Sequence, residues 1–354
     1  MSETSDMHSQ TQTRQLPLDM MRGVAALMVV AYHYTSRLGE LYPQYGSAFT
    51  FGIGHVGVHV FFVISGYVIF MTLNKLRAAG LGVVDFAKAR FYRLYPIFWV
   101  AVGVTFALVS QLTLPGREAS WSDALLNLTM IPRLLGANFV DGVYWSLEVE
   151  LIFYFWIAAI YFLVPPRLFP IALFVWVLLG KAVAVLAPQL SLFTAIRVLI
   201  IGDWVPLFAL GISIYLFHNR RVGPRTLFLF ALVFCVDAFT TLEPLESVVV
   251  IICAGLIYLF TSRWYSNFGA PSFRPLVWFG AISYPLYLVH QNIGYALILR
   301  LRDAGVHAPI ALLTVISVVI ALSSALTYGV EKPIMRWTRR DASRGPAVEP
   351  ANGV

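Results

Sequence analysis

Apolar runs long enough to cross a lipid bilayer recur along the whole chain, separated by short polar segments. An α-helix needs about 20 apolar residues to cross the hydrocarbon core. The runs predict ten spans, at residues 17–36, 56–73, 94–113, 145–164, 168–187, 198–217, 226–241, 246–262, 278–299 and 309–331. The expected fold is therefore all-α, a polytopic helical membrane protein.

The composition supports a membrane protein and excludes a soluble domain. The 354 residues are 59% hydrophobic and only 12% charged, and the mean hydropathy is +0.75. The first apolar run is not interpreted as a cleavable signal peptide, because it is long, contains an Arg and a His, and follows a polar tail. Cys235 and Cys253 fall inside apolar runs and are interpreted as packing residues.

Positive charge indicates on which side of the membrane each loop lies. The net charge is +7, and Lys and Arg crowd the loops after the second, sixth and eighth spans and the segment after the tenth. Cytoplasmic loops carry such an excess, so both termini are expected in the cytoplasm. The basic balance thus reflects topology and indicates no nucleic-acid partner.

Three regions are expected along the chain. A disordered cytoplasmic tail at 1–16 precedes a single transmembrane domain at 17–331, and a basic, then disordered cytoplasmic tail follows at 332–354. The longest loop, 114–144, is expected outside. Within it the stretch 123–135 is moderately apolar and predicts an interfacial or re-entrant helix.

Two ionisable residues, Arg22 and His33, lie inside the first span. Eleven positions of α-helix bring both side chains to one face, about 16 Å apart along the axis. Ionisable groups within a membrane span are expensive, which makes them candidates for a functional site. The alternative is that Arg22 reaches one interface while His33 makes an ordinary interhelical hydrogen bond.

A carboxylate in the fourth span is expected at the depth of His33. Glu150 lies about five residues into that span from the outside, and His33 is three or four residues from the outer end of the first. A carboxylate beside an imidazole can fix its tautomer, so His33 is a candidate base oriented by Glu150. A structural hydrogen bond is the alternative. Glu148 points roughly the other way on a helix and is expected to be solvated.

Arg90 and Arg93 lie one helical turn apart at the cytoplasmic mouth of the third span. Guanidinium groups suit bidentate recognition of phosphate, so the pair can grip a polyphosphate or a nucleotide. Arginine at a cytoplasmic helix end is also what topology alone requires.

Further histidines mark the second and ninth spans. His55 and His59 have the i,i+4 spacing of two metal ligands, but no third ligand is near in the sequence. His59 is expected to face an aqueous vestibule. His290 is a third intramembrane imidazole, and Pro285 is expected to kink the helix just below it.

Small residues at the end of one apolar run suggest a close helix contact. Ser65 and Gly66 follow two phenylalanines, and small residues let helices approach closely in a bilayer. A nucleophilic serine is the alternative, but no nucleophile-elbow sequence surrounds Ser65.

Taken together, these motifs resemble the acyltransferase-3 family, integral membrane O-acyltransferases that modify exported glycans or antibiotic sugars. The resemblance covers nearly the whole chain, from 17 to 331. It is carried by Arg22 and His33 with ten residues between them, GVHVFFVISG at 57–66, Arg90-x-x-Arg93, Trp145-Ser-Leu-x-Val-Glu150, and Ser283-Tyr284 leading to His290.

The resemblance implies a role for each matching residue. It implies catalytic roles for His33, Glu150 and His290, and acyl-CoA binding by Arg22, Arg90 and Arg93. We assign His59, Ser65, Trp145 and Tyr284 to substrate binding. One departure is His59, where the family often has an acidic residue.

The same resemblance implies acetyl-CoA as the donor, no metal, a glycan or glycoside as the acceptor, and a place in the bacterial inner membrane. The interpretation requires a passage from the Arg93 surface to His33. Transfer can be direct, with His33 as general base, or can pass through an acyl-enzyme. The alternative classes are a secondary transporter, which also needs intramembrane charge, and a non-catalytic membrane scaffold.

Overall fold

A computed structural model of the chain describes residues 16–186, 191–219, 223, 242–262 and 273–343. Every regular element in these residues is helical, which confirms the all-α prediction. The predicted span 226–241, with Cys235, and most of the two tails lie outside the described residues.

The long described helices overlap the predicted spans, but the helix of the third span begins at Val83, well before the predicted start at residue 94. In chain order the described helices are α2 (Leu16–Tyr32), α3 (Leu38–Leu41), α4 (Gly57–Ala78), α5 (Val83–Leu112), α6 (Trp121–Asn127), α7 (Trp145–Leu163), α8 (Phe169–Leu186), α9 (Ser191–Leu199), α10 (Val205–His218), α12 (Pro244–Thr261), α14 (Arg274–Val289), α15 (Gln291–Asp303), α16 (Ala308–Leu326) and α17 (Lys332–Ser343). Two π-helical turns, η1 (His33–Arg37) and η6 (Thr327–Glu331), extend α2 and join α16 to α17.

Within the described residues, five helical segments are long and apolar enough to cross a membrane: Gly52–Ala78, Val83–Leu112, Gly142–Leu163, Pro244–Thr261 and Ala308–Thr338. Phe169–Val183 and Val205–His218 are shorter apolar helices. The count of ten spans therefore stays a prediction.

Two predicted spans are interrupted in the structure. The span at 198–217 divides between α9 and α10, and the span at 278–299 is broken at His290, between α14 and α15. Pro285 lies inside α14, so the interruption falls at the histidine itself and not at the proline.

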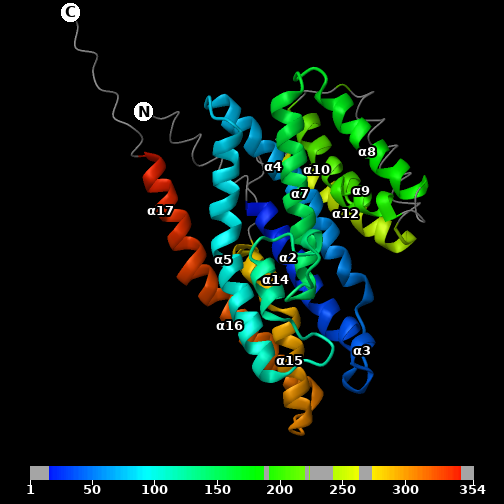
Figure 1. Cartoon of the computed structure of the whole chain (residues 1–354), viewed down its shortest axis with the longest axis vertical. Coiled ribbons are helices and arrows are strands. Elements are labelled where there is room, and N and C mark those ends of the chain that lie inside the picture. Colours follow the sequence, from blue (N-terminus) through cyan, green and yellow to red (C-terminus); the bar gives the residue numbers. More distant parts are fainter. Residues whose placement is uncertain (1–15, 187–190, 220–222, 224–241, 263–272, 344–354) are drawn as a thin grey trace, which may run out of the picture.

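The helices form a bundle with α2 and α14 at its centre (Figure 1). In Figure 1, α5, α16 and α17 lie on the left and α8, α9, α10 and α12 on the right. The α2–α14 and α4–α10 pairs are the most extensive helix contacts. The central position of α2 places Arg22 within the bundle, and His33 directly follows this helix.

Glycines set the spacing of these two helix pairs. A Cβ atom on Gly280 of α14 would collide with the backbone carbonyl of Asp19 in α2. A Cβ on Gly66 of α4 would collide with the backbone of Phe208 in α10. The expected close approach at Gly66 is therefore confirmed, and small residues have the same use at other helix contacts in bilayers.

Substituting Gly280 with alanine tests this packing. We expect Gly280→Ala to destabilise the protein by about 1–3 kcal/mol, because the obstructing atom belongs to the backbone and cannot rotate away. The matched control is Gly255→Ala in α12, where nothing lies within 4 Å of a Cβ. When thermal unfolding is measured in detergent, only Gly280→Ala should have a lower unfolding midpoint than wild type. Equal midpoints for both variants would contradict the packing argument.

The loop at 114–144 contains one short α-helix and two 3-10 turns instead of a helix over 123–135. Helix α6 ends at Asn127, and a 3-10 turn follows at Arg133–Leu135. Glu148 anchors this turn, because its carboxylate accepts hydrogen bonds from Arg133 Nε at 2.9 Å and from the Arg133 backbone N–H at 3.2 Å. Glu148 is 0% exposed, so its expected solvation was wrong: the sequence did not reveal a partner 15 residues earlier.

Candidate active site

A cavity of about 110 Å³ lies between α2, α4, α5, α7 and α14. These helices come from distant parts of the chain and bring together six of the predicted site residues. The six that line the cavity are Arg22, Ser65, Arg90, Arg93, Glu150 and Tyr284.

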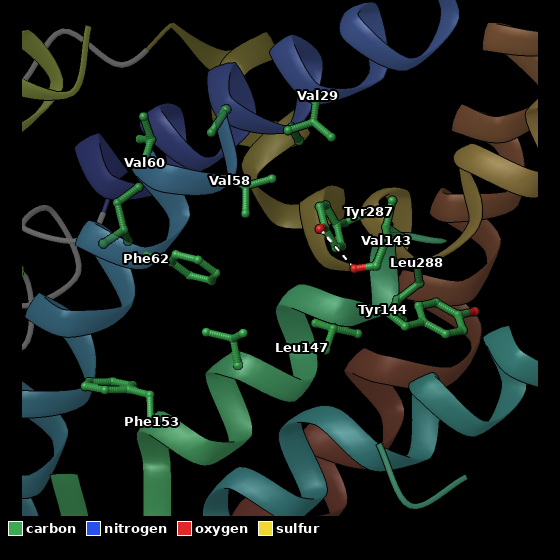
Figure 2. Packing of buried hydrophobic residues seen from close by; sticks show 14 of the residues in the cluster. Val29, Val58, Val60, Phe62, Val143, Tyr144, Leu147, Phe153, Tyr287 and Leu288 are labelled. Atoms are coloured by element: carbon green, nitrogen blue, oxygen red, sulfur yellow. Dashed lines mark hydrogen bonds between the residues drawn. The ribbon is translucent and has the colours of Figure 1, made fainter. Parts of the chain in front are cut away.

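One part of the cavity is apolar and the other is cationic. Figure 2 shows Val58, Phe62 and Leu147 facing each other across a common space, and all three line the cavity. Arg22, from α2, and the two arginines from α5 supply three cations. This combination suits a ligand with an anionic end and a slender apolar or weakly polar arm.

The three arginines differ in how well they are paired. Arg22 Nη1 lies 3.5 Å from Asp19 Oδ1, and Arg93 forms an ion pair with Glu331. The buried Nε of Arg90 has no hydrogen-bond partner, although its guanidinium lies 6.0 Å from the ring of Phe86. A buried donor without a partner is costly, so the Arg90 guanidinium can donate a further hydrogen bond to an anionic oxygen atom.

Glu150 lies in the cavity, but its contacts differ from those predicted. Its carboxylate accepts hydrogen bonds from the Ser65 hydroxyl and, at 2.6 Å, from the Tyr154 hydroxyl. Tyr154 also lines the cavity. The predicted pairing with His33 must be corrected, because these hydroxyls hold the carboxylate and His33 has other partners.

The partner of His33 is His290, 257 residues later in the chain. His290 Nε2 lies 3.1 Å from His33 Nδ1, and the two ring centroids are 4.8 Å apart. The predicted site residues His33 and His290 therefore meet directly. His33 Nδ1 also lies 2.9 Å from the backbone oxygen of Val29.

The neighbouring backbone carbonyls determine which ring nitrogen of each histidine carries a hydrogen. His290 Nδ1 lies 2.9 Å from the carbonyl oxygen of Tyr287 and 3.1 Å from that of Leu286. Carbonyl oxygens only accept, so Nδ1 of His290 carries the hydrogen and its Nε2 accepts when the ring is neutral. His33 Nδ1 then donates to His290 and Val29. This leaves the lone pair on His33 Nε2 to take up a proton.

Both histidines lie where a regular α-helix ends. His33 is the first residue of the π-turn η1, and His290 lies between α14 and α15. The Tyr34 hydroxyl donates to the carbonyl oxygen of His290 at 2.6 Å and fixes the interruption. π-turns are frequent at functional sites.

Tyr287 separates the histidines from the cavity. Tyr287 lines the cavity, whereas His33 and His290 do not, and its ring centroid lies 5.8 Å from that of His290. Its hydroxyl lies 2.6 Å from Ser146 Oγ. The same hydroxyl donates to the Val143 carbonyl oxygen at 3.1 Å, the hydrogen bond drawn in Figure 2. The expected passage from Arg93 to His33 is therefore interrupted at Tyr287 in this conformation.

His59 and Trp145 do not line the cavity. His59 is only 6% exposed and its ring packs 5.6 Å from Trp204, so the expectation that it faces an aqueous vestibule was wrong. Trp145 packs on the same residue at 5.0 Å. His55 Nε2 lies 2.7 Å from Glu246 Oε1. No group of three metal-ligating side chains occurs among the described residues.

Four neighbours of the predicted residues were not found from the sequence. Ser146 lies within the Trp145-Ser-Leu motif, but the resemblance assigned it no role. Tyr154 and Tyr287 lie in apolar spans, where a tyrosine is equally expected as a packing residue. Glu331 differs, because an acidic residue at the end of the tenth predicted span is a recognisable signal. The sequence could not reveal that its partner is Arg93.

Asp141, just before α7, joins the segment that leads into α7 to the start of α15. Its carboxylate accepts hydrogen bonds from the backbone N–H of Asn292 at 2.9 Å and of Val143 at 3.2 Å. Asp141 is 0% exposed. Burial raises the pKa of its carboxyl from the ordinary 3.8 to about 7, although the two N–H groups and Arg117 oppose this shift.

The raised pKa of Asp141 predicts a pH-dependent stability. The folded state binds this proton more tightly than the unfolded state, so its contribution is full below pH 3.8 and is lost as pH rises through about 7. The loss amounts to at most about 4 kcal/mol. As the pH is raised from 4 to 8, the thermal unfolding midpoint of wild type should decrease relative to that of Asp141→Asn. Parallel curves for the two proteins would contradict this assignment.

Comparison with known proteins identifies the class of this fold and site. A family model described as "Acyltransferase domain" matches residues 17–328. The chain belongs to the acyltransferase-3 family and is a membrane acyltransferase.

The chain is also similar to the exopolysaccharide production protein ExoZ of Rhizobium meliloti (strain 1021). The two are 30% identical over 110 residues, which are 29% of this chain and 33% of that protein. The match thus spans about a third of the curated relative. No solved structure matches this chain significantly.

Proposed function

We propose that this protein transfers an acetyl group from cytoplasmic acetyl-CoA to a hydroxyl group of an exported polysaccharide, across the bacterial inner membrane. The observation that carries the proposal is one cavity that is lined both by three arginines and by Tyr287, whose ring lies next to the His33–His290 pair. Family membership supports the acyl transfer. The name of the relative, an exopolysaccharide production protein, supports the acceptor class.

The cationic end of the cavity suits the nucleotide of the donor. We assign Arg22, Arg90 and Arg93 to the phosphates of acetyl-CoA, because guanidinium groups bind phosphate oxygens in bidentate geometry. The charged nucleotide cannot cross the bilayer core, whereas the pantetheine arm is long and thin. This arm would lie along the apolar wall that includes Val58 and Phe62.

The histidine pair suits deprotonation of the acceptor. In the proposed direct transfer, His33 Nε2 takes the proton of the acceptor hydroxyl as its oxygen bonds to the thioester carbon. The carbon–sulfur bond then breaks with its electron pair on sulfur, and the proton passes from His33 to that sulfur to give free CoA. His290 and the Val29 carbonyl orient His33.

Transfer requires the Tyr287 side chain to move. The thioester can reach His33 only if the contact between Tyr287 and Ser146 opens. Tyr287 lies between Pro285 and the helix interruption at His290, and both features loosen a helix. A closed resting state also keeps protons from leaking along a polar path through the membrane.

Labelled transfer tests the proposal. Membrane vesicles containing the protein receive acetyl-CoA with a labelled acetyl group, and the polysaccharide is analysed by mass spectrometry for one acetyl increment. Covalent label on the polysaccharide supports the proposal. Label that crosses the vesicle without becoming covalent would favour a transporter, and acetyl-protein formed with donor alone would exclude the direct route.

A further inference from the structure

Arg93 is already held by an anionic group of the protein itself. Its guanidinium forms an ion pair with the Glu331 carboxylate, which comes from the last residue of the π-turn η6. The Glu331 side chain is 8% exposed and that of Arg93 is 34% exposed. Glu331 does not line the cavity, whereas Arg93 does, so Arg93 stands between the carboxylate and the cavity.

This ion pair leaves polar atoms unsatisfied. Glu331 Oε2 is buried and has no hydrogen-bond partner, and neither has the nearby Nε of Arg90. A buried carboxylate oxygen without a donor is costly, and a buried ion pair is worth little unless its remaining atoms are satisfied. The pair is therefore a poor candidate for a purely structural contact, and an incoming anion would meet a cluster with unused hydrogen-bonding capacity.

A carboxylate and a phosphate can each accept two parallel hydrogen bonds from one guanidinium group. We propose that Glu331 is a resident competitor for the donor: it holds Arg93 in the empty site and gives it up to a phosphate oxygen when the donor binds. This inference rests on the proposed acyl-CoA donor. It adds that the affinity for the donor is lowered by the need to displace the Glu331 carboxylate from Arg93.

The segment that carries Glu331 can accommodate the exchange. A π-turn is an irregular turn within helical structure, and nothing lies within 4 Å of a Cβ built on Gly329 inside η6. Glu331 is joined directly to α17, whose Trp337 ring lies 6.0 Å from that of Tyr92 in α5.

The test is the affinity of the full-length protein in detergent for free CoA, measured by isothermal titration calorimetry. Glu331→Gln removes the competing charge but keeps the size of the side chain. We expect it to bind CoA about tenfold more tightly, because a ligand's apparent affinity falls with the fraction of protein whose site is not competent to bind it. The matched control is Glu40→Gln, which removes an exposed carboxylate paired with Arg37 in η1.

A second variant covers the case in which Glu331→Gln does not fold. Glu331→Asp keeps the charge but shortens its reach, and is expected to bind CoA more tightly than wild type by a smaller factor. Tighter binding by the position 331 variants, with Glu40→Gln unchanged, supports the inference. Binding equal to or weaker than wild type at position 331 overturns it. Failure of wild type itself to bind CoA would instead overturn the proposed donor, and the inference with it.

Discussion

Replacing His33 with alanine is expected to lower the rate of acetyl transfer by about 10²–10⁴-fold, the usual contribution of a general base. The reason is geometric. The carbonyl oxygens beside His290 Nδ1 require a hydrogen on that atom, so His290 Nε2 accepts the hydrogen of His33 Nδ1. His33 Nε2 is then left free to act as the proposed base. The loss should appear in kcat at saturating acetyl-CoA, because His33 does not line the cavity that we propose for the donor.

The control for this variant is His307→Ala, which removes an exposed histidine just before α16. The rate of labelled acetyl transfer is measured for both proteins, together with their affinity for free CoA. We expect unchanged CoA binding in both, and loss of turnover only in His33→Ala. A His33→Ala protein with full turnover would refute the base and the acyl-enzyme roles alike.

Local sequence patterns predicted the membrane class, the helical fold and most members of the site. An ionisable residue in an apolar run is visible in the sequence, and the rule that such residues are functional candidates selected Arg22, His33, Glu150 and His290. Five helices bring six of the ten selected residues to one cavity, and two more form the histidine pair.

The partners of these residues could not be predicted, because depth in the membrane fixes only one coordinate. His33 and Glu150 were expected at one depth, but rotation about each helix axis decides which side chains meet. The structure pairs Glu150 with Ser65 and Tyr154 and pairs His33 with His290. Helix rotation depends on packing contacts such as Gly280 against Asp19, whose partners are far apart in the sequence.

Distant partners also explain why the burial of Glu148 and His59 was not predicted. Glu148 and His59 were expected to meet water because they lie near the ends of their spans, yet both are buried. The loop at 114–144 folds back to cover Glu148 through Arg133, and Trp204 covers His59. Neither cover lies next to the covered residue in the sequence.

Arg93→Gln is expected to raise the KM for acetyl-CoA by about 10–10²-fold. Loss of one partner in a fully buried charged hydrogen bond costs about 2–5 kcal/mol, and the Arg93 side chain is 34% exposed. The effect on kcat should be smaller, because a phosphate grip far from the reacting carbon acts equally in the ground and transition states. Arg300→Gln is the control, since this arginine donates to the Leu112 carbonyl away from the cavity.

Arg93→Gln alone also leaves Glu331 buried without its cation, so part of any loss would reflect a destabilised protein. The double variant Arg93→Gln with Glu331→Gln removes both charges and separates the two effects. If Arg93 binds the donor, the double variant recovers thermal stability but keeps the raised KM. If Arg93 serves only to neutralise Glu331, the double variant recovers both. The proposed donor site depends on the first of these results, since an arginine that matters only to its internal partner cannot be the one that holds the nucleotide.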